Sequence, residues 1–291
     1  MARYAFSEYM YERYFLNDYY RIKPMNHQTI SLEFLTAGKN NDQSSFTTKL
    51  SELGQSIRTT LLGSNKVAST EWKYTADSLS FVKYHLKDDA EYQSYMNVRE
   101  KTVYIPPGFK GSMVSFSALL LDGARLLAKL ESDYIRPIET QLSMCLASPD
   151  RFKKTHTSEC VDLGAKQLNQ IYDNINSYFS GTLRSDQANL SEVYARLKDI
   201  DTTADNLIET LKITQELTPV RMNSRAMVLS SLVDKLVIRM KQKPENFELN
   251  GMNAKVIGEM TYTLARVFEF YATMHNNITM AVHALVDTFN D

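Results

Sequence analysis

Six basic side chains gather in residues 219–243, which makes anion binding the first chemistry to consider. They are Arg221, Arg225, Lys235, Arg239, Lys241 and Lys243. Asp234 is the one acidic residue among them. Lysine and arginine on a helix bind phosphate groups with a strong salt dependence, so nucleic acid or an anionic membrane is a candidate partner. The absence of aromatic residues among the basic ones disfavours single-stranded nucleic acid.

The stretch before this basic segment is acidic. From Asp186 to Glu216 there are seven acidic and three basic residues. The simplest interpretation is that the two segments form helices that lie side by side and attract each other. In the functional alternative, the basic helix faces an acidic partner, a phosphate backbone or an anionic lipid.

The histidines do not have the spacing of a metal site. They are His27, His85, His156, His275 and His283. A carboxylate-bridged di-iron centre needs Glu-x-x-His pairs, and no histidine has a carboxylate three residues before it. His275 and His283 are separated by about 80° around a helix, so a shared metal would need ligands from another helix.

The two cysteines also do not have the spacing of a metal site. Cys145, His156 and Cys160 form the one Cys/His cluster, but no fourth zinc ligand lies near them. Cys145 also fits an apolar helical face. Two cysteines are no disulfide framework, and a Cys145–Cys160 bridge is the alternative to free thiols. We therefore predict no metal and no cofactor.

No catalytic motif is found. The segment Gly108 to Ser112, "GFKGS", precedes a helix and carries Lys110, but it lacks the spacing of a phosphate-binding loop. We expect a turn in which Ser112 is the N-cap, with weak anion binding as the alternative. A non-enzymatic role is the prediction, and an enzyme whose site is built across a helical bundle is the third hypothesis.

The first 23 residues are rich in aromatic side chains. They are Tyr4, Phe6, Tyr9, Tyr11, Tyr14, Phe15, Tyr19 and Tyr20. On a helix these rings would point to several sides, so one bundle surface could not cover them all. We expect the segment to pack in a groove of its own chain or, as we predict for function, to dock on a neighbouring subunit. Adsorption to a membrane is the third alternative.

Apolar residues repeat about every seven positions through the second half of the chain. Between residues 190 and 285 they predict three long helices, with a start at Thr218-Pro219 and a last helix from Met252 to about Phe289. An earlier helix begins near Ser112, and Pro137 should kink it or end it at Arg136. Residues 112–291 should form a bundle of long helices.

The N-terminal third is less regular. Helices are predicted around residues 46–61 and 72–86, whereas "TISLEFL" and "KTVYIPPG" favour a short strand pair. The organisation is therefore a docking segment (1–23), a mostly helical region (24–111) and the bundle (112–291). The fold class is mainly α, as an elongated helical bundle.

Composition limits the function further. The chain has 291 residues and a formal net charge of -1, so no overall field attracts nucleic acid or membrane. No signal peptide or membrane-spanning run is found, which predicts an intracellular protein. Our leading hypothesis is a structural or assembly subunit that binds copies of itself or other subunits. A component of a virus particle, in particular of a tailed phage, is the specific candidate.

Overall fold

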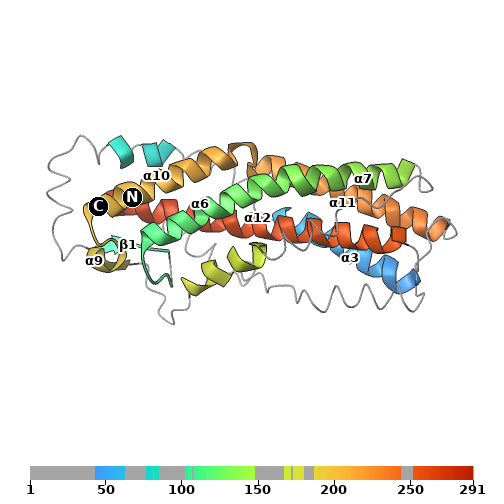
Figure 1. Cartoon of the computed structure of the whole chain (residues 1–291), viewed down its shortest axis with the longest axis horizontal. Helices are drawn as coiled ribbons and strands as arrows, with labels where there is room; N and C mark the ends of the chain where they lie inside the picture. Colours follow the sequence, from blue (N-terminus) through green and yellow to red (C-terminus); the bar gives the residue numbers. More distant parts are fainter. Residues whose placement is uncertain are drawn as a thin grey trace, which may run out of the picture.

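The computed structural model describes residues 43–62, 77–80, 82–84, 102–106, 108–147, 167–171, 173–179, 187–243 and 252–290. These residues form long helices that run side by side in an elongated bundle, with one small sheet (Figure 1). The fold is mainly α, as the heptad pattern predicted. Among the described residues, no helix is long and apolar enough to cross a membrane.

The helix predicted from Ser112 onward continues through Pro137. It consists of α6 (Met113–Leu130), a π-helical turn (Glu131–Ile135) and α7 (Arg136–Ala147). The backbone N–H of Arg136 donates to the carbonyl of Glu131, five residues back. Such a wide turn relieves the clash between a proline ring and the carbonyl of the preceding turn. Of the two outcomes predicted at Pro137, a kink or an end at Arg136, the end of the helix is therefore wrong.

The first of the three helices predicted between residues 190 and 285 is interrupted near its start. Residues Leu190–Val193 form the short α9, and α10 begins again at Leu197–Ile213. Between them Tyr194 has extended backbone angles, φ -128° and ψ 110°, and its side chain is buried. Burial of this ring outweighs the local helical pattern. The carboxylate of Asp199 then accepts from the backbone N–H of Arg196 at 3.0 Å and caps α10.

After a 3-10 turn (Thr214–Glu216), α11 runs from Pro219 to Gln242. The predicted start is confirmed, because Thr218 is the N-cap and its hydroxyl accepts from the Arg221 N–H. Figure 1 shows α10 and α11 one after the other along the bundle. α10 packs mainly on α6, whereas α11 packs mainly on α3 (Gln43–Leu62) and α7. The expectation that the acidic and basic segments lie side by side is therefore wrong.

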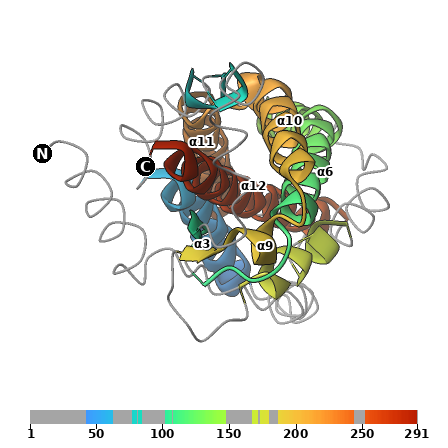
Figure 2. The ribbon, with the colours of Figure 1, turned by 90° about the vertical axis from the view of Figure 1, so that its left-hand side faces the viewer.

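The last helix, α12 (Met252–Asn290), has the predicted bounds and lies among the other helices (Figure 2). Its predicted apolar seam is fully buried, and so are Phe268 and Phe270 on its flanks. A helix that is apolar nearly all round belongs in the centre of a bundle. α3 packs against α11 and α12, so this part of the N-terminal region contacts the bundle directly.

The small sheet joins distant parts of the chain. β1 (Thr102–Tyr104) pairs antiparallel with β2 (Gln187–Asn189), with Val103 opposite Ala188. The Tyr104 N–H donates to the Thr288 hydroxyl at 3.1 Å and so attaches the sheet to the end of α12. The strand in "KTVYIPPG" is thus confirmed, although its partner comes from residues 187–189. The "TISLEFL" segment lies outside the described residues.

One further predicted helix, residues 72–86, is seen in part. Residues 77–80 and 82–84 are helical, and Leu79 and Val82 are buried as the pattern predicted. The ammonium of Lys83 contacts Asp205 and lies 3.4 Å from Asp201, so this segment is attached to α10.

Gly123 sets how closely α6 approaches α12. A Cβ atom at this position would lie 2.5 Å from the Met274 sulfur, closer than van der Waals contact. We expect Gly123→Val to lower stability by about 1–3 kcal/mol through overpacking. Thermal unfolding of the purified protein measures this. Met274→Ala is destabilising by itself, so the double variant should lose less than the sum of the two single losses, and additive losses would contradict the close approach.

Candidate anion-binding groove

The structure divides the six predicted anion-binding residues into two groups. In the first, the Arg225 guanidinium contacts Glu131 and also Glu139, the latter at 2.9 Å. Arg221 contacts Glu216. These two arginines are already neutralised within the chain, and Arg225 joins α11 to the π-helical turn and α7. The six residues therefore do not form one continuous anion-binding surface.

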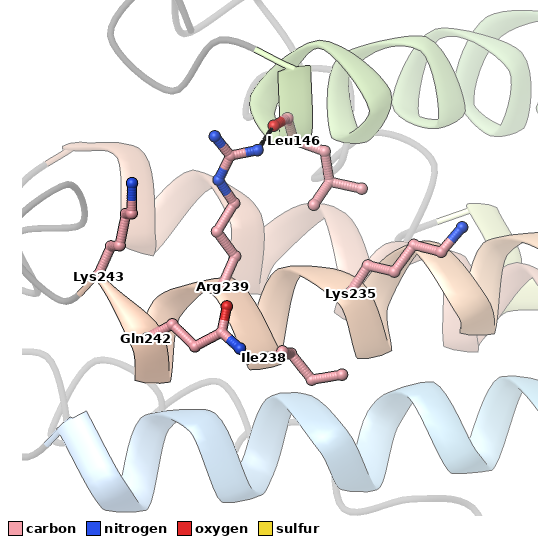
Figure 3. A pocket seen from close by; sticks show the side chains of 6 residues that line it. All are labelled: Leu146, Lys235, Ile238, Arg239, Gln242 and Lys243. Atoms are coloured by element: carbon pink, nitrogen blue, oxygen red, sulfur yellow. Dashed lines mark hydrogen bonds between the residues drawn. The ribbon is translucent and has the colours of Figure 1, made fainter.

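The second group lies at the C-terminal end of α11. Three of its members line a shallow groove of about 410 Å³ between α11 and the end of α7. The lining side chains belong to Lys235, Arg239, Lys243, Ile238, Gln242 and Leu146. Figure 3 shows Arg239 reaching from α11 to the carbonyl oxygen of Leu146, with Lys235 and Lys243 on either side of it along α11. Lys241 is exposed on the same helix but does not line the groove.

The helix period explains why these cations share one side. Lys235, Arg239 and Gln242 follow at intervals of four and three residues, which places them on one face of α11. Asp234 points elsewhere, because its carboxylate lies beside Gly54 of α3. No ion pair within the described part of the chain involves Lys235, Arg239 or Lys243. The groove therefore carries positive charge with no carboxylate among its lining residues.

The spacing of the histidines predicts no metal site. Both His275 and His283 lie on α12, and the Nε2 atom of each ring is buried although part of the residue stays accessible. Burial lowers the pKa of each imidazole to about 4, because desolvation disfavours the charged form. Among the residues that the structure describes, no three metal-ligating side chains come together.

Cys145 is a free, buried thiol. Desolvation raises its pKa to about 11, so little reactive thiolate is present at neutral pH. Its predicted place on an apolar helical face is confirmed. His156 and Cys160 lie outside the described residues, as do His27 and His85.

The "GFKGS" segment has the geometry of a turn. Gly108 and Gly111 have positive φ angles of 76° and 111°. The Lys110 N–H donates to the Tyr178 carbonyl at 2.8 Å, so it is not available to cradle a phosphate. Ser112 stands at the N-cap of α6, but its side chain makes no capping hydrogen bond. The Phe109 ring stacks on Tyr178 and holds the turn on the bundle.

The aromatic docking residues lie outside the described part of the chain. They are Tyr4, Phe6, Tyr9, Tyr11, Tyr14, Phe15, Tyr19 and Tyr20. Docking through this segment therefore stays a prediction.

A buried polar cluster on α12 was missed at the sequence level. The Arg266 guanidinium contacts Glu269 at 2.8 Å and the amide oxygen of Asn169 at 2.6 Å. The side chains of Arg266 and Glu269 are only 6% and 5% exposed. The i, i+3 spacing of opposite charges inside an apolar helix was the signal that could have revealed it.

The fold and the groove define an elongated helical-bundle protein with a cationic groove at one end of α11. Comparison of the chain with protein-family models, with curated proteins and with solved structures gives no match.

Proposed function

We propose that this protein is a non-enzymatic structural or assembly subunit that associates through the outward side of α11, in the first place with a second copy of itself. The observation that carries the proposal is a row of exposed apolar side chains, the outer row of α11. Its members are Val220, Met227 and Ile238, with Val228 about 80° further round the helix, and their exposed fractions are between 45% and 53%. Large apolar side chains grouped on a surface are typical of protein interfaces.

The outer row has the geometry of a helix-docking face. Val220 and Ile238 are 18 residues apart, or five helical turns, and Met227 lies within about 20° of the line between them. Ser224 and Ser231 are exposed on the same helix and are small enough to let a second helix approach. A partner helix laid along α11 would cover the row over its full length.

Charge favours an antiparallel arrangement of two copies. Parallel pairing would bring the basic ends of both α11 helices together. Antiparallel pairing separates them and places Lys241 and Lys243 near the start of the partner's helix, where Glu216 and Arg221 compensate each other. In this arrangement both subunits use the same surface patch, as two-fold symmetry requires.

The contact would be weak by itself. α11 is about 36 Å long, and a strip about 10 Å wide covers roughly 360 Å² per partner. Stable complexes bury about 800 Å² per partner. Association should therefore depend on protein concentration, and the aromatic segment of residues 1–23 is the predicted source of further contact. A virus particle, such as that of a tailed phage, is the setting in which we place such a subunit.

The native mass of the protein in solution tests this proposal. We expect the mass of the full chain to rise between micromolar and millimolar concentration, and Met227→Glu with Val228→Glu to weaken association by about tenfold or more. Deleting residues 1–22 should also weaken it while the helical signal is kept. Tyr84→Glu, another exposed site, is the matched control. A strict monomer throughout that range would contradict self-association.

A further inference from the structure

We propose that the groove between α7 and α11 binds a ligand that carries a phosphate group. The site consists of Lys235, Arg239 and Lys243 with the amide of Gln242 and the apolar side chains of Leu146 and Ile238. This inference is distinct from self-association because it concerns a ligand other than protein, although Ile238 and Lys243 take part in both proposals.

The three cations are arranged around a fixed arginine. Arg239 is partly buried, and its guanidinium is held by the Leu146 carbonyl at the end of α7. An arginine has five N–H donors, so several remain for an anion after this contact. A guanidinium held in place loses little side-chain freedom on binding, and its planar fork matches phosphate oxygens. Lys235 and Lys243 add point charges on both sides of it (Figure 3).

A purely structural role does not account for all three residues. Basic side chains near the end of a helix interact favourably with its dipole, which explains Lys243, and Arg239 caps α7. The dipole effect falls off within the last turn, and Lys235 lies about two turns before the end of α11. Like charges four residues apart repel each other. A bound anion would remove this repulsion.

The extent of the site indicates a small ligand. From Lys235 to Lys243 the helix rises about 12 Å, which is enough for one or two phosphate groups. The farther basic residues, Arg221 and Arg225, are engaged by carboxylates, so the positive surface does not continue along α11. A nucleic acid needs a longer track of cations. Ile238 and Leu146 can contact the organic part of a phosphate ester, and Gln242 can bind an ester or hydroxyl oxygen.

The probes are inorganic pyrophosphate and vesicles, each tested with the full chain at low salt. Pyrophosphate binding is measured by calorimetry. Vesicles of phosphatidylcholine with and without phosphatidic acid are tested by flotation. Binding of pyrophosphate alone indicates a soluble phosphate ester, and retention on phosphatidic acid vesicles as well indicates a lipid headgroup. Either result supports a phosphate site if it depends on the groove lysines.

The test variant is Lys235→Gln with Lys243→Gln, since both side chains are exposed and neither takes part in an ion pair among the described residues. We expect at least a tenfold loss of affinity. Lys198→Gln with Lys212→Gln on α10 is the matched control and should bind as the unmodified chain does. The Met227→Glu, Val228→Glu variant should also keep its affinity, which separates this site from self-association.

Three outcomes would overturn the proposal. The first is no binding of either probe, and the second is binding that the groove variant leaves unchanged. The third is tight binding of single-stranded DNA that strengthens with its length, because a short groove cannot produce that dependence.

Discussion

Replacing Arg266 with methionine should destabilise the folded protein by about 3–5 kcal/mol, because it leaves the Glu269 carboxylate buried without its cation. The two side chains are almost completely buried on α12, and their contact is 2.8 Å long. Removing one charge from such a pair costs more than removing both, since the remaining buried charge loses the cation beside it. Chemical denaturation at pH 7 measures the loss.

The double variant Arg266→Met, Glu269→Leu is the matched control. Replacing a buried ion pair by apolar side chains of similar size is often neutral or stabilising, so most of the loss should be recovered. Asn169 is exposed and stays solvated when Arg266 is gone. A single-variant loss below about 1 kcal/mol would mean that water reaches the pair.

Acidification from pH 7.5 to pH 4 should lower the free energy of unfolding by about 3 kcal/mol for each of His275 and His283. Their pKa values in the folded protein are about 4, against the usual value of 6.5. Above pH 6.5 both states are neutral, so this stabilisation is fully present. Between pH 6.5 and 4 the unfolded state binds more protons, and the stabilisation is lost as the pH falls.

Urea denaturation at several pH values measures this decline. His275→Gln and His283→Gln should each remove about half of the histidine-dependent part, whatever their effect on stability at pH 7.5. Carboxylates also titrate near the lower end of this range, so the comparison is between the slopes of variant and unmodified protein above pH 5. Equal slopes would show that the buried imidazoles do not determine the decline.

Much of the fold follows from local sequence. The bounds of α12, the start of α11 at Thr218-Pro219 and the end of α3 at Leu62 agree with the predictions. Helix caps, proline and heptad spacing act over a few residues, so the order of amino acids alone contains this information. The mainly α class follows for the same reason.

The sequence by itself also located a basic segment at residues 219–243, but only the tertiary structure decided which of its charges remain available. Arg225 is neutralised by Glu131 and Glu139, which are 94 and 86 positions away in the chain. Arg239 is held by Leu146, 93 positions away. The break at Tyr194 likewise depends on where its ring is buried. Such pairings depend on which helices pack against each other in the folded chain. Helical periodicity shows that a helix has an apolar face, but it does not show which other helix that face contacts.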